Sequence, residues 1–264
     1  MVFKIATFNV NGIRARLEPV VSWLQKHDPH VLCLQEIKCE DKNFPHQVFQ
    51  ELGYNITLKG QKAFNGVATL TKAAPREVIE EFTDWGDQDD ARFIAVLVDN
   101  LWVVNTYVPQ GRSPEDPAFQ YKLEFFRRLK SWFQERFRKE DLVVWLGDMN
   151  VAPTPLDLFD PDRYEGGVGF HPAEREALRD VLSWGFTDLF RLHHPEAKQY
   201  TFWDYRLPKS FQRNLGWRLD HIFASSPLAK HCSECKVDDH VRGENKPSDH
   251  VPVCALLHLP GGLS

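Results

Sequence analysis

Several features that restrict what a protein can do are missing from this chain of 264 residues. No apolar run approaches the ~18 residues that a membrane span needs. The first residues, MVFKIATFNVNG, have neither the basic start nor the long apolar stretch of a signal peptide. With only five cysteines, an odd number, no disulfide framework of the secreted kind is expected. We therefore expect an intracellular, cytoplasmic protein with no membrane partner.

Linkers and internal repeats are also missing. No Gly/Ser-rich or Pro-rich stretch divides the chain, and no repeat recurs at the periods of about 20–50 residues that mark solenoids. A chain of this length can bury about 73% of its unfolded surface, which is enough for a full-sized core. We expect residues 1–264 to form a single domain, and a monomer is the default because nothing in the sequence requires a second copy.

A large net charge is missing too, since the formal net charge is only −5. Taken as an average, that value argues against a polyanionic partner such as nucleic acid. The acids are segregated, however, and a short segment without any base holds six of them: Glu80, Glu81, Asp84, Asp87, Asp89 and Asp90. Without these six the remainder carries a formal charge of +1. Phosphate contacts depend on charge within about a Debye length, ~8 Å at physiological salt, so DNA is not excluded and its binding is expected to be moderate and salt-sensitive.

Strand-like and helix-like patterns alternate along the chain. Apolar runs typical of strands occur at 3–8, 31–34, 93–98, 101–108, 142–146, 218–223 and 251–259. Helical spacing of apolar residues follows between them, with one stripe at Leu17, Val20, Val21 and Leu24, and another at Phe119, Leu123, Phe126, Phe133 and Phe137. A third helix is predicted from Pro172 to a stop at Gly185. Mixed strands and helices over one uninterrupted length indicate an α/β fold with two packed sheets or one large one.

Polar side chains follow several of these buried runs. Those at or after four of the first five strands are Asn9, Asn11, Gln35, Glu36, Asn105, Tyr107, Asp148 and Asn150, and a later group contains Asp220, Asp249 and His250. Ligand sites in α/β proteins form where strands end. The set consists of oxygen and imidazole groups, which suits a hard cation such as Mg²⁺.

Eight short motifs occur in a characteristic order: FNVNG, LQEIK, NGVA, YVPQG, LGDMN, FWDYR, GWRLDH and PSDH. Together they closely resemble the exonuclease III family of abasic-site endonucleases, within the endonuclease/exonuclease/phosphatase superfamily. The resemblance implies a four-layer α/β sandwich of two packed mixed β-sheets flanked by helices. It also implies a Mg²⁺-dependent repair nuclease, with Mn²⁺ able to substitute, that acts on duplex DNA with abasic sites or 3′ ends. The reaction would cleave the phosphodiester 5′ to an abasic site and leave a 3′-hydroxyl, accompanied by 3′–5′ exonuclease and 3′-end-cleaning activity.

The motif positions imply a role for each polar residue. The expected metal ligands are Glu36, Asn11 and Asp249. The expected catalytic residues are Asp148 and Asn150 for the attacking water, Asn9 to orient Asp148, Tyr107 against the phosphate, and His250 with Asp220. A carboxylate beside a histidine raises the pKa of its imidazole above ~6.5, which keeps it cationic for a phosphate that gains charge in the transition state.

Substrate recognition requires an apolar slot for a sugar that lacks its base. Aromatic and basic residues alternate late in the chain, from Phe202 to Arg218, as suits a flipped nucleotide flanked by phosphates. The resemblance places Phe202, Trp217 and Leu219 in the slot, and the expected substrate-binding set is completed by Arg218, Gln110 and Gly169. Glycine at 169 would leave the pocket open.

Two other functions are compatible with the same chemistry. A phosphoesterase of lipids or inositol phosphates would share the Glu, Asp and His residues, although the Phe202–Asp204 and Trp217–His221 segments favour DNA. A nucleic-acid-binding relative without activity is disfavoured because every catalytic position holds a competent residue. The sequence leaves open whether Asp148 or His250 is the base, with Asp148 preferred, and whether one or two metals bind.

Overall fold

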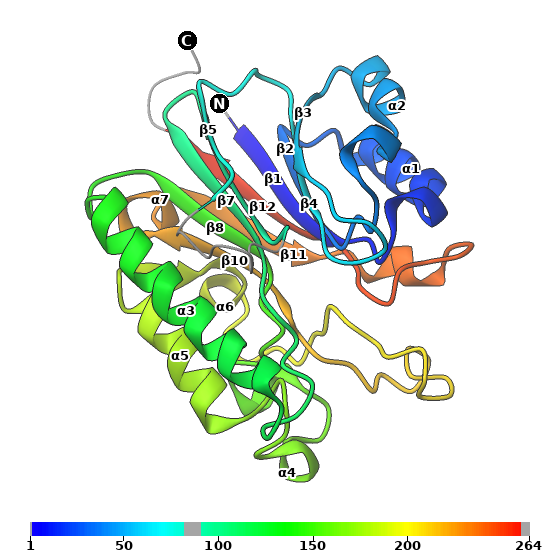
Figure 1. Ribbon diagram of the computed structural model, residues 1–264, viewed down its shortest axis with the longest axis vertical. Coiled ribbons are helices and arrows are strands. Elements are labelled where there is room, and N and C mark those ends of the chain that lie inside the picture. Colours follow the sequence, from blue (N-terminus) through cyan, green and yellow to red (C-terminus); the bar gives the residue numbers. More distant parts are fainter. Residues whose placement is uncertain (1, 82–90, 260–264) are drawn as a thin grey trace.

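The computed structural model describes residues 2–81 and 91–259, and its framework is two mixed six-stranded sheets (Figure 1). The strands of the first sheet, in spatial order, are β11 (Cys232–Val237), β12 (Val253–His258), β1 (Val2–Asn9), β2 (Val31–Gln35), β4 (Val67–Thr71) and β3 (Asn55–Lys59). Those of the second are β5 (Glu77–Ile79), β6 (Phe93–Val98), β7 (Leu101–Tyr107), β8 (Val143–Asp148), β10 (Asp220–Ser225) and β9 (Phe186–Asp188).

The two sheets share one pairing pattern. In each, the two central strands are parallel, β1 with β2 and β7 with β8, and every other neighbouring pair is antiparallel. The carboxyl ends of each parallel pair therefore point to one edge of their sheet. That edge is where the polar residues predicted at strand ends are delivered.

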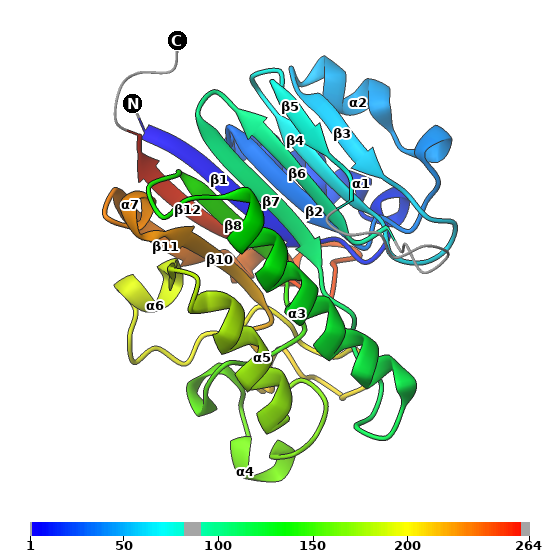
Figure 2. The ribbon, with the colours of Figure 1, turned by 60° about the vertical axis from the view of Figure 1, so that its left-hand side comes forward.

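Helices cover the outer faces of both sheets. The α-helices are α1 (Leu17–His27), α2 (His46–Glu51), α3 (Pro117–Arg136), α4 (Pro161–Tyr164), α5 (Pro172–Leu182), α6 (Leu189–His193) and α7 (Ser226–Ala229). Short 3₁₀ turns lie at Ile13–Ala15, Asp41–Asn43, Pro155–Asp157 and Asp239–Gly243. Figure 2 shows α3 and α5 across the second sheet, with α1 and α2 on the far side of the first. In the described ranges, no helix is both long and apolar enough to cross a membrane.

Three apolar clusters separate four layers. The largest lies between the sheets, where β1 and β12 contribute Ile5 and Ala255 while β6 and β8 contribute Val96 and Leu146. A second joins the other face of the β5–β10 sheet to α3 and α5, and a third joins the β1–β4 sheet to α1 and α2. The predicted four-layer sandwich is confirmed. All seven predicted strands and all three predicted helices exist, with shifts of a few residues at their ends.

Five strands were not predicted from the apolar pattern. β3, β5 and β11 lie at sheet edges and are largely half-buried or exposed, so they lack the continuous apolar run of a buried strand. β9 is only three residues long, and the buried strand β4 (VATLT) contains two threonines. Four residues of the predicted apolar stripe are buried, Phe119, Phe126, Phe133 and Phe137, whereas Leu123 is only half-buried and the neighbouring Lys122 is fully buried.

Candidate active site

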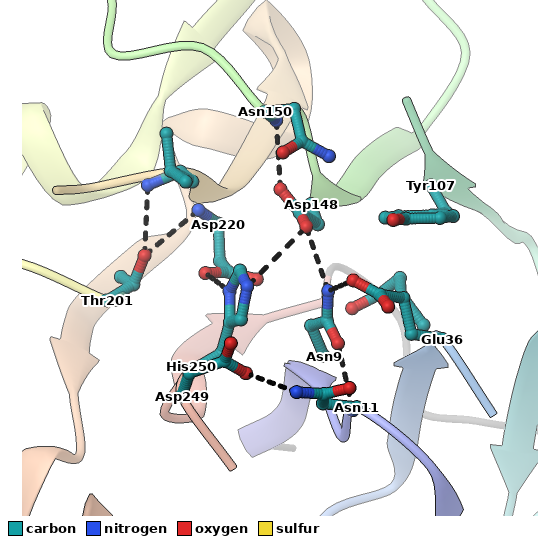
Figure 3. Close-up of polar contacts among 12 residues, drawn as sticks. Asn9, Asn11, Glu36, Tyr107, Asp148, Asn150, Thr201, Asp220, Asp249 and His250 are labelled. Atoms are coloured by element: carbon teal, nitrogen blue, oxygen red, sulfur yellow. Dashed lines mark hydrogen bonds and ion pairs between the residues drawn. The ribbon is translucent and has the colours of Figure 1, made fainter. Parts of the chain in front are cut away.

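Both sheets bring polar residues to one shared site. The parallel pair β1–β2 ends at Asn9 and Gln35, directly before Glu36, and the pair β7–β8 ends with Tyr107 opposite Asp148. The antiparallel neighbour β10 begins at Asp220, which is also paired with Asp148. Figure 3 shows the side chains of Asn9, Glu36, Tyr107, Asp148 and Asp220 pointing toward one another from the ends of the strands.

Glycine is needed in strand β8, at the position directly before Asp148. Gly147 has φ +139°, and a Cβ there would lie 1.9 Å from the carbonyl oxygen of Thr106 on the adjacent strand. No L side chain fits that approach, so the backbone can bring β8 against β7 only with glycine at this position. The residue that follows, Asp148, is thereby held at the end of a rigid central strand.

Asn9 joins the two carboxylates of the site. Its Nδ2 donates to Glu36 Oε1 and to Asp148 Oδ2, each at 2.8 Å. Its Oδ1 accepts from the backbone N–H of Asn11 at 3.0 Å, which determines how the amide is oriented. Asp148 also accepts a bond from the backbone N–H of Asn150 at 2.9 Å through Oδ1. Asn9 therefore contacts Asp148 directly, and its role in orienting Asp148 stays a prediction.

His250 lies between two carboxylates. Its Nδ1 is 2.7 Å from Asp220 Oδ2, and its Nε2 is 3.8 Å from Asp148 Oδ2. Burial lowers the pKa of His250, but the charges of Asp220 and Asp148 outweigh burial and raise that pKa to about 10. His250 is therefore an imidazolium at neutral pH, with Nδ1–H donating to Asp220. The side chain of Thr201 positions Asp220 by accepting from its backbone N–H at 3.0 Å.

The carboxylates around this imidazolium differ in their pKa values. Burial, together with the charges of Asp220 and Glu36, raises the pKa of Asp148 against the opposing effect of His250. Burial also acts to raise the pKa of Glu36, but Lys38 and Asn9 outweigh it and lower that pKa below its usual value. Tyr107, buried beside Glu36 and Asp148, has a strongly raised pKa and stays a neutral phenol. The site thus combines a fixed anion, a cation and a carboxyl that gains and loses a proton more readily than its neighbours.

The site contains a cluster of ligand atoms suited to a metal ion. One ligand atom each of Glu36, Asp148 and His250 lies within 4.8 Å of the others. The other two predicted ligands, Asn11 and Asp249, contact each other, since Asn11 Nδ2 donates to Asp249 Oδ1 at 3.0 Å. Lys38 places its ammonium 2.7 Å from Glu36 Oε2 and within hydrogen-bond distance of Asn11 Oδ1. These oxygens therefore already attract a cation.

A cavity of about 570 Å³ opens beside this cluster. Ten of the predicted site residues line it: Glu36, Tyr107, Gln110, Asn150, Gly169, Phe202, Trp217, Leu219, Asp249 and His250. The Phe202 ring packs against His250, with ring centroids 4.8 Å apart. Gly169 faces Trp217 so closely that a Cβ at 169 would lie 3.2 Å from the Trp217 ring. Charged and apolar groups thus share one cavity.

Comparisons with known proteins agree with this geometry. The family model described as the endonuclease/exonuclease/phosphatase family matches residues 6–250. This chain belongs to that family. The exodeoxyribonuclease III of Haemophilus influenzae is 35% identical, over 96% of this chain and 98% of its own length.

Solved structures of the family share the fold. The structure of an AP endonuclease from Archaeoglobus fulgidus has a TM-score of 0.94 and 41% identity, covering 97% of this chain and all of that one. The 3′ phosphatase NExo from Neisseria, bound to a product DNA hairpin, has the same TM-score and coverage at 35% identity. The predicted family, fold and hydrolase class are confirmed, and so is the predicted function at the level of a DNA repair nuclease.

One predicted substrate-binding residue of this family member lies elsewhere. Arg218 has 1% of its side chain exposed and does not line the cavity. Its Nε donates to Asp157 Oδ1 at 2.6 Å, and its Nη2 donates to Asp188 Oδ2 at 2.8 Å. The prediction for Arg218 is therefore corrected, because its guanidinium binds carboxylates of the protein instead of facing the cavity.

The structure also adds residues that the sequence did not single out. Lys38 joins the cluster of ligand atoms, and Tyr164 lines the cavity with its ring against Trp217 at a centroid distance of 4.9 Å. Lys38 lies within the LQEIK motif, which was a usable signal, whereas nothing around Tyr164 marks it. In the acidic segment, Asp84, Asp87, Asp89 and Asp90 lie outside the described residues.

Proposed function

We propose that this protein cleaves the phosphodiester 5′ to abasic sites in duplex DNA, with Mg²⁺ as its metal, and also removes nucleotides and blocking groups from 3′ ends. The observation that carries the proposal is the shared cavity, in which His250 lines the wall beside the apolar slot of Phe202, Trp217 and Leu219. The buried Asp148 lies directly behind His250, with its Oδ2 3.8 Å from His250 Nε2. The relatives support it, since one is titled an AP endonuclease and another a 3′ phosphatase.

The protein's own residues account for the proton and charge movements. Asp148 accepts a proton from the attacking water, for which its raised pKa makes it a better base than an ordinary carboxylate. The water adds to phosphorus, and the bond to the 3′ oxygen of the preceding nucleotide breaks as that oxygen takes up a proton from solvent. Asp148 then returns the proton that it accepted to solvent. The imidazolium of His250 donates to a phosphate oxygen as negative charge grows there, while Asp220 holds its ring.

Glu36, Asn11 and Asp249 would hold the Mg²⁺. The choice of metal rests on their hard oxygen ligands, and Mn²⁺ would fit the same donors. When bound, the ion neutralises charge on the phosphate oxygens. Lys38 supports the fit, because its ammonium shows that the oxygens of Glu36 and Asn11 stabilise positive charge at this position.

The apolar slot would select a sugar without a base. Phe202, Trp217 and Leu219 offer apolar surface, and Gly169 keeps the wall next to Trp217 free of a side chain. Gln110 and Tyr107 line the same cavity and would contact the phosphates that flank the abasic site. An open slot next to the reacting phosphate favours cleavage within a duplex as well as at its 3′ end.

A 5′-labelled duplex with a single abasic analogue tests this function. Incubation with Mg²⁺ is expected to give one product that ends in a 3′-hydroxyl, with Mn²⁺ able to replace Mg²⁺ and EDTA abolishing the cut. A recessed undamaged 3′ end, digested in parallel, measures the share of exonuclease activity. An intact abasic duplex together with rapid hydrolysis of an inositol phosphate would refute the proposal.

Four further expectations accompany the proposed function. The whole chain acts as one domain and as a monomer, and the protein works in the cytoplasm. DNA binding is moderate and weakens as salt rises, because phosphate contacts release counterions. Size-exclusion chromatography with light scattering tests whether the protein is a monomer. A titration of labelled duplex at several salt concentrations tests the strength and salt dependence of DNA binding.

A further inference from the structure

A fully buried ion pair lies behind the cavity wall. Lys122 on α3 and Glu174 on α5 each have 0% of their side chains exposed, and Lys122 Nζ is 2.5 Å from Glu174 Oε1. Removing two charges from water is expensive, and apolar residues of similar size usually stabilise such a position as well or better. Stability alone therefore does not explain why a charged pair stands between two helices.

The contacts of Lys122 point toward the site. Its ammonium donates to the backbone carbonyl of Asn150 at 2.8 Å and to that of Gln110 at 3.2 Å. Asn150 has a left-handed backbone with φ 52°, and its N–H donates to Asp148. A lysine on the outer helix thus holds the turn that follows the proposed base.

The contacts of Glu174 include the backbone of Gly169, which lines the same cavity. Its Oε2 accepts from the backbone N–H of Gly169 at 2.8 Å and of His171 at 3.1 Å. The His171 contact belongs to the N-terminal cap of α5 and would occur in any helix of this kind. The Gly169 contact goes further, because Gly169 is the residue that faces Trp217 in the slot.

We propose that Lys122 and Glu174 form a positioning pair for the nuclease site. The pair connects three separate loops, those of Gln110, Asn150 and Gly169, through four directional bonds to backbone groups. An apolar pair would fill the same space without specifying where these backbone groups lie. The inference rests on the proposed function for the roles of Asn150 and Gly169, whereas the contacts themselves are independent of it.

The distinguishing test compares Lys122→Met with Leu129→Ala, a buried apolar position on the same helix that does not line the cavity. Both variants are expected to melt at lower temperature than the wild type. At a temperature where both are folded, Lys122→Met should lose kcat on the abasic duplex by roughly 10- to 100-fold, because a shift of about 1 Å in a positioned group has that effect. Leu129→Ala should keep kcat within twofold per folded molecule.

Glu174→Gln provides a variant of equal volume if Lys122→Met fails to fold. Whichever way the new amide turns, it places its NH₂ against a donor, either the ammonium of Lys122 or the N–H groups of Gly169 and His171. We expect a larger KM for the abasic duplex, by roughly tenfold, because the wall at Gly169 moves away from Trp217. A structural role alone would lower the melting temperature and leave KM unchanged.

The two possible failures are separable. A wild-type protein that does not cut the abasic duplex but digests a recessed 3′ end refutes the abasic-site proposal, and the same variants are then measured on the 3′ end. A folded Lys122→Met with kcat within twofold of the wild type on the cleaved substrate overturns the positioning pair. Unchanged KM and kcat in Glu174→Gln overturns it as well.

Discussion

Two buried clusters of charge lie near β10 and behave in opposite ways. The cavity cluster consists of Glu36, Asp148, Asp220 and His250. The arginine cluster consists of Asp157, Asp188, Arg191 and Arg218. Both place carboxylates around a cation, and both involve segments near β10. Burial acts to raise the pKa of Asp148 in the first cluster and of Asp157 and Asp188 in the second, yet the net pKa of Asp148 is raised whereas those of Asp157 and Asp188 are lowered.

The ratio of positive to negative groups explains the difference. In the arginine cluster two guanidinium groups face two carboxylates, and Arg218 makes directional bonds to both of them. In the cavity cluster the imidazolium of His250 is shared among more carboxylates than it can neutralise, with Lys38 beside Glu36 only. The unsatisfied negative charge leaves one carboxyl ready to take up a proton and attracts a cation. Arginine stays charged at any relevant pH and lowers the pKa values of Asp157 and Asp188, whereas the raised pKa of Asp148 lets the cavity cluster gain and lose a proton.

The most direct way to break this comparison is to remove the carboxyl with the raised pKa. Asp148→Ala is expected to lower kcat on the abasic duplex by roughly 10²–10⁴-fold, since it removes a general base. Binding of uncleaved abasic duplex should stay near the wild-type level, because the slot is untouched. Steady-state kinetics and a gel-shift titration measure the two effects. Asp180→Ala, an exposed carboxylate on α5, serves as the control, and near-normal turnover of Asp148→Ala would rule out the proposed base.

Breaking the arginine cluster should affect stability instead. Arg218→Met leaves two buried carboxylates without their main partner, which is expected to cost about 3–5 kcal/mol in the free energy of unfolding. Arg136→Met removes a surface pair with Glu77 and should cost about 0–1 kcal/mol. Urea unfolding followed by fluorescence measures both. If Arg218→Met were as stable as Arg136→Met, the arginine cluster would have no structural importance.

A substitution at Gly169 tests whether cleavage depends on an open cavity beside the cavity cluster. Gly169→Leu is expected to reduce kcat/KM on the abasic duplex by roughly 10- to 100-fold, because its Cβ meets the Trp217 ring at 3.2 Å. Gly166→Leu provides a matched control, since it has a similar positive φ of +79° but nothing within 4 Å of its Cβ. Undiminished abasic cleavage by Gly169→Leu would count against an open slot.

The smallest expected effect is a difference in how the stability of the two clusters changes at acid pH. The folded-state pKa values of Asp157 and Asp188 lie below the unfolded value of about 3.9, so the stability they contribute is present above pH ~5 and lost as pH falls through their folded pKa values. Each unit of difference in pKa corresponds to about 1.4 kcal/mol. Asp157→Asn should be less stable at pH 7 and lose less stability between pH 5 and pH 3 than the wild type. The exposed Asp162→Asn should follow the wild type, and equal slopes for all three would contradict the assignment.

Residues that follow strands could be predicted, whereas residues that pair across the fold could not. Asp148, Glu36 and His250 come directly after or before apolar runs in recognisable motifs, and the parallel strand pairs then bring them together. Arg218 lies in an equally distinctive motif, yet its partner Asp157 is 61 positions away, and no local sequence pattern indicates the bond between them. Nothing in the sequence singles out Lys122, and only the packing of α3 against α5 places it inside.

The order of apolar runs and the motifs between them determined the layers, the strand ends and the chemical types available to the site, because these properties depend on local pattern. The tertiary structure alone decided which charges face the cavity and which are sealed within the protein. Burial and the ratio of cations to anions are properties of packed neighbours from distant segments. They raise the pKa of Asp148 behind the cavity wall while lowering those of Asp157 and Asp188 around Arg218.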